Sequence, residues 1–190
     1  MIKLIQSFYY QLIKCDIINN RGGSVELLDI YDSNGNVTGK TILRGDKNVK
    51  LDKDEHIAVA VIFIENDNGE FLIQKTSKEK GGEFSSTGGH VDSGETPLTS
   101  IKREVKEELG VSVDADKIEN FGFLLFDMPI RFLFYLKKNI NLDDVIIQKE
   151  EVDYVKYMNI NEIDELIKAN KMLKSHGIMF NKLLKKIHKR

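Results

Sequence analysis

Residues 88–111 constrain the fold of this 190-residue chain more than any other segment. The segment opens with a Gly-Gly pair and continues to Thr96 and Pro97, which suit the N-cap and first position of a helix. Gly110 suits the helix end, because glycine readily adopts a left-handed backbone conformation. The spacing predicts a helix over Pro97–Leu109, preceded by a loop whose backbone can approach a ligand closely.

Three glutamates of this helix, Glu104, Glu107 and Glu108, stand at i, i+3 and i+4 and share an arc of roughly 100°. They flank an apolar stripe expected to face the core, made of Leu98, Ile101, Val105 and Leu109. Neighbouring like charges repel by a few tenths of a kcal/mol per pair, and a bound cation removes that repulsion. Oxygen ligands favour magnesium, manganese or calcium. The same charges are also typical of a solvent-exposed acidic face, so the surrounding residues decide between the two interpretations.

The surrounding residues complete a longer pattern with fixed spacing, formed by Gly89, Glu95, Arg103, Glu104, Val105, Glu107, Glu108, Gly110 and Val111. This pattern resembles the signature of the Nudix hydrolase family at every constrained position. The resemblance implies an α+β Nudix fold, in which a mixed β-sheet sandwich has flanking helices. It also implies a metal-dependent hydrolase that cleaves the diphosphate bond of a nucleoside diphosphate-linked or related small molecule, by attack of water at phosphorus.

The resemblance assigns metal ligands and structural residues. It implies that Glu104, Glu107 and Glu108 hold Mg²⁺, with Mn²⁺ as an alternative, and that the carbonyl of Gly88 adds a ligand. Residues with structural roles in the motif are Gly89, Glu95, Arg103 and Gly110. An arginine–carboxylate pair suits such a role because it is planar and bidentate.

The general base and the substrate contacts are less well defined. Some family members take the base from the helix, here Glu107, while others use a glutamate on a later loop, here Glu151. His90 follows the glycine pair and is a weak candidate for substrate binding, with a hydrogen bond to a loop carbonyl as the alternative. Aromatic residues that could stack on a base are expected in the core instead; they are Phe84, Phe126 and Tyr135.

Hydrophobic periodicity predicts the remaining elements around the motif. Strands are expected at Glu26–Tyr31, Val37–Leu43, His56–Glu65, Phe71–Gln74, Ile118–Phe126, Ile130–Leu136 and Val152–Met158. Helices are expected at Met1–Asp16, Ile160–Ala169 and Gly177–Ile187, and a glycine-rich loop at Ser85–His90. We expect one Nudix domain over residues 1–190, with an N-terminal helix and β-hairpin extension (1–54), a core (55–168) and a C-terminal helix (169–190). The basic C-terminal residues are expected to form a solvated helix end; they are Lys182, Lys185, Lys186, Lys189 and Arg190.

The composition limits which kinds of binding partner are expected. The formal net charge of −2 gives no bias toward nucleic acid or an anionic membrane, so we expect a small-molecule diphosphate as the partner. The single cysteine, Cys15, excludes an intrachain disulfide and favours a cytoplasmic setting. We expect neither a membrane span nor a signal peptide. A homodimer is expected only by analogy with relatives.

Two alternatives differ in chemistry. The hairpin over residues 28–44, with His56 and His90, resembles isopentenyl-diphosphate isomerases, but Gly88 stands where that family needs its catalytic cysteine. Residues 128–132 also lack the glutamates of that family. A ligand-sensing Nudix domain without catalysis is the second alternative, although such domains usually lose motif glutamates that this chain keeps. The loops expected to select the substrate, residues 76–84 and 126–131, carry no recognisable signature.

Overall fold

The computed structural model describes residues 26–46, 48, 50–126 and 129–187. Nine strands form one mixed sheet: β1 (Leu27–Asp32), β2 (Val37–Leu43), β3 (Glu55–Glu65), β4 (Phe71–Thr76), β5 (Phe84–Ser85), β6 (Thr87–His90), β7 (Glu119–Leu125), β8 (Pro129–Lys137) and β9 (Val152–Met158). The helices are α2 (Pro97–Leu109), α3 (Ile160–Lys168) and α4 (Lys174–Ile187), with short 3₁₀ turns at Lys78–Lys80, Ala115–Lys117 and Leu142–Asp144. The helix expected over Met1–Asp16 lies outside the described residues.

Strand β3 lies at the centre of the sheet. It pairs in parallel with β8 and antiparallel with β1, β4 and β6. Its sequence from Ile57 to Ile64 is almost entirely apolar, as expected for a strand covered on both faces. Successive side chains alternate between the faces, so Ala58, Ala60, Ile62 and Ile64 belong to one core cluster while Val59, Val61 and Phe63 belong to the other.

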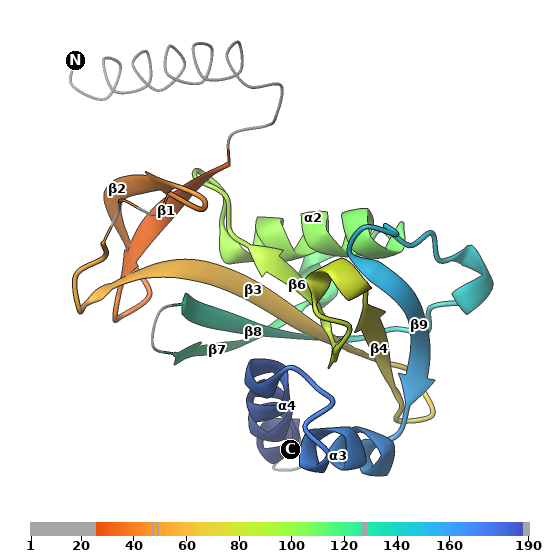
Figure 1. Ribbon diagram of the computed structural model, residues 1–190. Helices are drawn as coiled ribbons and strands as arrows, with labels where there is room; N and C mark the ends of the chain where they lie inside the picture. The colour runs from red at the N-terminus through yellow and green to blue at the C-terminus, as the bar shows by residue number, and fades with distance from the viewer. Residues whose placement is uncertain (1–25, 47, 49, 127–128, 188–190) are drawn as a thin grey trace.

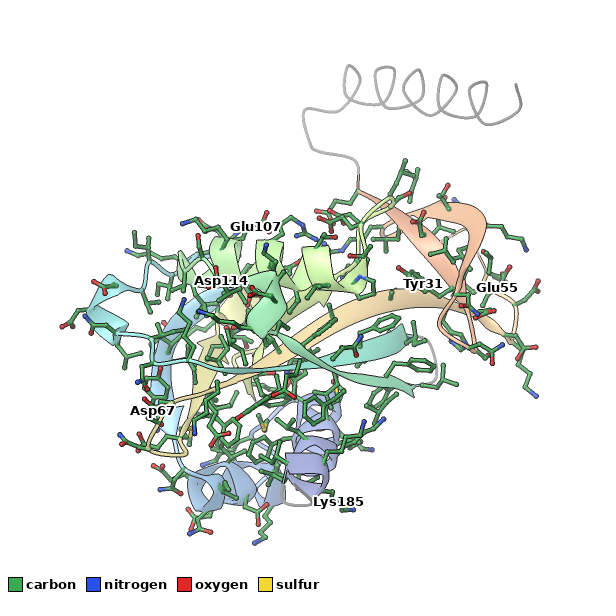
Figure 2. The ribbon with its side chains drawn as sticks, turned by 180° about the vertical axis from the view of Figure 1, so that it is seen from behind. Tyr31, Glu55, Asp67, Glu107, Asp114 and Lys185 are labelled. Atoms are coloured by element: carbon green, nitrogen blue, oxygen red, sulfur yellow. The ribbon has the colours of Figure 1, made fainter. Side chains whose placement is uncertain are left out.

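The helices cover opposite faces of this sheet, with α2 on one face and α3 and α4 on the other (Figure 1). The side chains of Ile101, Val105 and Leu109 are fully buried beneath α2, which confirms three positions of the expected stripe; Leu98 packs partly buried against the same cluster. The other core is visible from behind in Figure 2, where the side chains between the sheet and α4 fill the interface. The α+β architecture expected from the sequence, a mixed sheet with flanking helices, is therefore confirmed.

The lysines of α4 were expected to be solvated; Lys185 and Lys186 are exposed, whereas Lys182 is partly buried. Lys182 donates a hydrogen bond to the carbonyl of Phe123 at 2.7 Å, and Lys186 donates to the carbonyl of Phe121. Lys186 also lies 5.4 Å from the centre of the Phe121 ring. Their long apolar stems reach across the helix surface, so the charged ends bind the last exposed carbonyls of β7. Lys189 and Arg190 lie outside the described residues.

Sequence periodicity placed most elements correctly. Helix α2 and strands β2 and β9 have the expected bounds, and the ends of the other described elements differ from expectation by at most three residues. Thr96 Oγ1 accepts a hydrogen bond from the Thr99 amide, and Gly110 has φ +70°, so both caps form as expected. The glycine-rich loop expected over Ser85–His90 was wrong, because β5 and β6 occupy most of it. The backbone of residues 85–90 pairs with β3 and β4, and the local sequence cannot indicate these pairing partners.

The N-terminal hairpin is attached to the approach loop of α2. Asp29 accepts hydrogen bonds from the Ser93 hydroxyl at 2.6 Å and from the Gly94 amide at 2.9 Å. The Ser93 amide donates to the carbonyl of Leu27 at 2.7 Å. Strand β1 therefore forms one wall beside the motif. Within the described part of the chain, no helix is long and apolar enough to cross a bilayer.

Candidate active site

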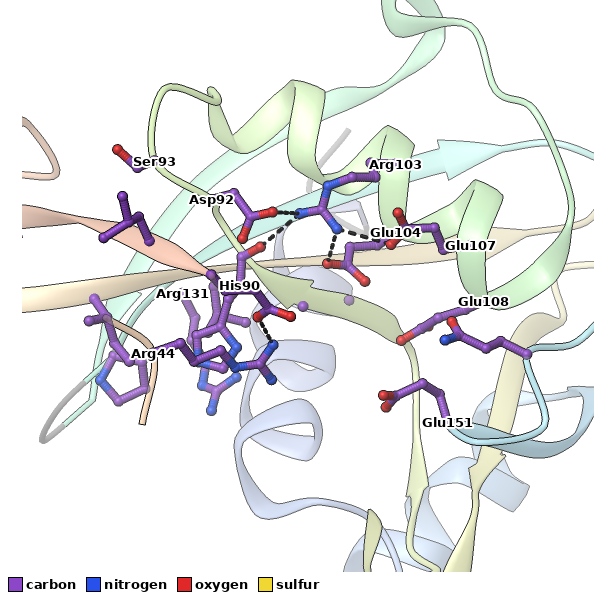
Figure 3. Close-up of a pocket in the computed structure, with 18 of the residues that line it drawn as sticks. Arg44, His90, Asp92, Ser93, Arg103, Glu104, Glu107, Glu108, Arg131 and Glu151 are labelled. Carbon is purple, nitrogen blue, oxygen red and sulfur yellow. Dashed lines mark hydrogen bonds and ion pairs between the residues drawn. The ribbon is translucent and has the colours of Figure 1, made fainter. Parts of the chain in front are cut away.

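A pocket of about 630 Å³ opens beside the glutamates of α2. It is lined by residues from eight parts of the chain: Glu26, Leu27, Arg44, Ile57, Val59, Gly88, Gly89, His90, Asp92, Ser93, Arg103, Glu104, Glu107, Glu108, Pro129, Arg131, Gln148, Glu151, Leu173 and His176. Figure 3 shows Glu108 and Glu151 on one side of this pocket and Arg44, His90 and Arg131 on the other. Glu108 and Glu151 are thus grouped on the side of the pocket opposite Arg44 and Arg131.

Glu104 fits against the backbone of β6 because residue 89 is glycine. A Cβ at Gly89 would lie only 2.3 Å from Glu104 Oε1. The Glu104 side chain is 13% exposed, and burial raises the pKa of its carboxyl group. Gly89 therefore makes room for a carboxylate at the sheet edge, which is a concrete reason for the motif's glycine.

Glu108 is the most buried of the three helix glutamates, with 6% of the residue exposed. It accepts hydrogen bonds from Gln74 Nε2 at 3.0 Å and from the backbone amide of Gly88. Burial nonetheless raises its pKa to about 8, and the nearby Glu104 and Glu151 carboxylates add to this rise. Two adjacent buried carboxylates suit a hard divalent cation, which would offset their charge.

Arg103 forms hydrogen bonds to several other residues of the motif. It bonds to Glu95 through Nε and Nη2, to Glu104 through Nη1 at 2.8 Å, and to the carbonyl of His90 at 3.1 Å. These carboxylates, Glu95 first, raise the pKa of Arg103, which stays charged. Arg103 therefore fixes α2 against the loop that precedes it, the arrangement expected from the sequence for Arg103 and Glu95.

Glu107 is the most exposed of the three helix glutamates and shares Arg103 as a partner with Glu104. Its side chain is 50% exposed and bonds to Arg103 Nη1 at 3.0 Å. Among the residues that the structure describes, no three acidic, histidine or cysteine side chains converge into a ready-made metal cluster. Glu104 and Glu108 have the burial and oxygen chemistry that a divalent ion needs, whereas Glu107 is paired with Arg103.

Gly110 positions the loop that carries Glu151. A Cβ at Gly110 would lie 2.9 Å from Cβ of Ile146, so glycine is needed for close approach as well as for the helix end. The Ile146 amide donates to the carbonyl of Leu109, and the Gln148 amide donates to the carbonyl of Glu108 at 3.1 Å. These bonds hold the loop so that Glu151 lies near Glu108 on the same side of the pocket (Figure 3). Glu151 also pairs with Lys80 at 2.6 Å.

The two histidines compared with the isomerases do not meet. His90 aligns with Val59 on β3 and lines the pocket, whereas His56 aligns with Tyr31 on β1 and bonds to Ser33 at 3.0 Å. Because His56 and Val59 are three residues apart on a strand, their side chains point to opposite faces. Burial, with Arg44 and Arg131 nearby, lowers the pKa of His90 to about 4, so it is neutral at pH 7.

Sequence reasoning did not identify Arg44, Arg131 or His176, which line the pocket, or Gln74, which hydrogen-bonds to Glu108. Gln74 and His176 lack any motif and reach the site only through tertiary packing. Arg131 stands in a segment named as a substrate loop, and an arginine within an apolar strand was a usable signal. The aromatic expectation was correct for Tyr135, which is buried, and for Phe84 and Phe126, which pack partly buried against the same core.

Comparison with known proteins decides the family, because the model of the NUDIX domain matches residues 54–179. The chain belongs to the Nudix family. It is 32% identical over 147 residues to an uncharacterized Nudix hydrolase of Listeria monocytogenes, which covers 75% of this chain and 85% of that relative. The 8-oxo-dGTP diphosphatase of Haemophilus influenzae is 39% identical over 85 residues, covering 42% of this chain and 61% of that protein.

Solved structures agree on the Nudix fold. A crystal structure of a protein from Deinococcus radiodurans superimposes with a TM-score of 0.68 at 21% identity, covering 82% of this chain and 98% of that one. This chain is accordingly a Nudix hydrolase. Gly88 lacks the thiol that the isomerase alternative requires, and His56 lies outside the pocket.

Proposed function

We propose that this Nudix hydrolase cleaves the diphosphate bond of a nucleoside diphosphate-linked or related small molecule, with water as the nucleophile. The observation that carries the proposal is the burial of Glu104 and Glu108 near each other, with Glu151 close to Glu108 on the same side of the pocket. Glu104 is paired with Arg103, whereas the hydrogen bonds of Glu108 come from the neutral amides of Gln74 and Gly88. A buried carboxylate without a counter-charge is costly, so this arrangement supports a site that binds a cation together with a phosphate substrate.

The residues that would hold Mg²⁺, or Mn²⁺, are Glu104, Glu107, Glu108 and the carbonyl of Gly88. When bound, the ion supplies charge neutralisation at the phosphoryl oxygens and lowers the pKa of a coordinated water. Glu107 would join the set by exchanging its bond to Arg103 for the metal, and its exposure leaves it free to do so. Arg103 would remain held by Glu95 and by the carbonyl of His90.

Glu151 is the proposed general base, with Glu107 as the alternative. Its carboxylate faces Glu108, and the Lys80 ammonium at 2.6 Å balances its charge. A base must lie within hydrogen-bond reach of the proton that it removes, or act through one water molecule. Glu151 can accept a proton from a water molecule between itself and the glutamates of α2, while the hydrogen bonds at Gln148 keep its loop in place.

Several further expectations accompany this proposal. The cytoplasmic setting expected from the single cysteine, the single-domain organisation over 1–190 and the homodimer stay predictions. The substrate is a small molecule, and 8-oxo-dGTP belongs on the panel because one relative carries the name of its diphosphatase. His90 is proposed as a substrate contact, because it lines the pocket between the glutamates and Arg131.

The test is phosphate release from a panel of nucleoside triphosphates, dinucleotides, sugar nucleotides and non-nucleotide diphosphates, with and without magnesium. We expect magnesium-dependent turnover of at least one compound, and its loss in Glu104→Gln. Glu165→Gln, an exposed glutamate on α3, is the matched control and should keep full activity. Binding of a panel compound without turnover would favour the ligand-sensing alternative. Conversion of isopentenyl diphosphate to dimethylallyl diphosphate would favour the isomerase.

A further inference from the structure

A row of three side chains crosses the sheet on the face covered by α4. Val59 on β3 lies opposite His90 on β6 and opposite Arg131 on β8, so the three residues share one face. Neighbouring strands are about 4.8 Å apart, which places the backbones of His90 and Arg131 roughly 10 Å apart, with Val59 between them. All three line the pocket, and Figure 3 shows His90 and Arg131 on the side away from Glu108.

Arg131 has no acidic partner among the described residues. Its Nε is buried without a hydrogen bond, and its nearest recorded contact is the Phe126 ring, 5.5 Å from the guanidinium carbon. Arg44 at the rim of the same pocket differs, because Glu26 neutralises it. Arginines are seldom buried unless paired, since removing a charge from water is costly. A partly buried guanidinium whose Nε is buried and has no counter-charge therefore indicates that its anion comes from a ligand.

His176 supplies a neutral donor at the same place. Its Nδ1 accepts a hydrogen bond from the Ser86 amide at 3.1 Å, so the proton of the neutral ring is on Nε2. Burial, with Arg131 nearby, lowers the pKa of His176 to about 3, which keeps the ring neutral. The residue lines the pocket and is 6% exposed. The bond to Ser86 thus fixes both the tautomer and the orientation of the ring.

We propose that Arg131, with His176 beside it, binds a phosphate group of the substrate other than the one held at the glutamates. The inference rests on the proposed diphosphate hydrolysis for its substrate class. The planar guanidinium matches the oxygens of a phosphate and can bind two of them at once. Glu104 and Glu108 repel a second phosphate, whereas Arg131 offers an uncompensated positive charge in the same pocket. Arg131 thereby determines the orientation in which a diphosphate substrate binds in the pocket.

The direct test is phosphate binding by the metal-free protein. Inorganic phosphate is titrated in EDTA, and the arginine Nε–H signals are followed by NMR. We expect the Arg131 signal to shift, and Arg131→Gln to weaken phosphate binding at least tenfold. Arg44→Gln, which removes the same charge from the rim, should change affinity less than threefold because Glu26 already neutralises Arg44.

The test also includes a lysine variant of Arg131 and a check that each variant is folded. Arg131→Lys retains the charge without the planar pair of donors and should fall between the wild type and Arg131→Gln. Melting curves identify any variant that has lost its fold, and the Arg131 signal of the wild type needs no variant at all. Equal phosphate affinity in the wild type and in folded Arg131→Gln would overturn the proposal, as would an equal loss in Arg44→Gln.

Kinetics then identify which phosphate is bound. A nucleoside diphosphate ends in a free phosphate, whereas a nucleoside diphosphate sugar has the same two phosphates capped by a neutral group. If Arg131 binds a terminal phosphate, Arg131→Gln raises KM for the first compound alone; if it binds an internal phosphate, KM rises for both. Phosphate binding without hydrolysis of any panel compound would leave this subsite standing and refute the proposed function.

Discussion

Arg103 and Glu95 lie side by side, with Nε 3.1 Å from Oε1 and Nη2 2.9 Å from Oε2. Eight residues separate them in sequence, and the Thr96 cap and the first two turns of α2 lie between them. The paired hydrogen bonds therefore fix the rotation of α2 relative to its approach loop. Because the glutamates project from the same helix, this one pair determines where Glu104 and Glu108 point.

Replacing Arg103 with lysine should disturb the site without removing its charge. A lysine ammonium cannot reproduce the planar double hydrogen bond to Glu95 and also reach Glu104. We expect Arg103→Lys to lower magnesium affinity and kcat/KM by about 10- to 100-fold, the usual effect of losing a residue that orients metal ligands. Calorimetric titration and steady-state kinetics measure this, with Lys102→Arg as the neighbouring control. Unchanged metal affinity would show that the pair is dispensable.

Glu108 should dominate metal affinity among the helix glutamates. It is the most buried of the three and faces Glu151, whereas Glu107 is half exposed and bonded to Arg103. We expect Glu108→Gln to weaken magnesium or manganese binding at least about tenfold, with a smaller loss in Glu107→Gln. Calorimetric titration of both ions provides the comparison. Equal affinity in the wild type and Glu108→Gln would exclude Glu108 as a ligand.

Alanine substitutions at Gly88 and Gly89 should have different effects on stability and on metal affinity. A methyl group at Gly89 meets the flexible end of Glu104, whereas one at Gly88 would lie 2.3 Å from the backbone oxygen of Ala60. We expect Gly89→Ala to fold with a Tm close to that of the wild type but to lose metal affinity, because the carboxylate of Glu104 must move. Gly88→Ala should lower Tm by several degrees, in the range of about 4 °C per kcal/mol for a chain of this size. Calorimetry of both variants separates these effects, and a folded Gly89→Ala with full metal affinity would contradict the account.

Substitution of Glu151 should lower kcat more than it changes KM. Its carboxylate faces Glu108, while the adjacent Glu150 is exposed and contributes only its backbone carbonyl, which accepts a hydrogen bond from Ser77. Loss of a general base typically slows turnover by about 10²- to 10⁴-fold. We expect Glu151→Gln to lower kcat within that range with KM nearly unchanged, and Glu150→Gln to behave like the wild type. Similar kcat values in the two variants would assign the base to another residue, with Glu107 the next to test.

His176 should make stability depend on pH. Its pKa is lowered by burial to about 3 in the folded protein, whereas an unfolded histidine titrates near pH 6.5. Below pH 6.5 the unfolded chain binds a proton that the folded chain does not, so stability is full above this pH and falls as the pH drops toward 3. The free energy of unfolding should fall by about 1.4 kcal/mol per pH unit in that window through His176 alone. Urea denaturation between pH 7 and pH 5 measures the slope, which should be shallower in His176→Gln; equal slopes would mean that His176 takes up protons in both states.

The sequence determined the features of this protein that depend on neighbours along the chain. The caps at Thr96 and Gly110 set the ends of α2, and the four-residue spacing of Glu104 and Glu108 places them on one helix face. Alternation along β3 assigned its side chains to two faces. Local backbone geometry governs each of these features, so they could be predicted before any contact was known.

Only the tertiary structure decided which distant residues meet. His176 bonds to Ser86 across 90 residues, and Arg131 comes into line with His90 because β8 and β6 both pair with β3. The glycine-rich segment at residues 85–90 became strand for the same reason, since its hydrogen-bond partners lie on other strands. Strand register and helix docking depend on the fit of the whole core, in which no single residue indicates its partner. The sequence therefore identified the glutamates of the hydrolase, and the fold placed Arg131 and His176 in the pocket beside them.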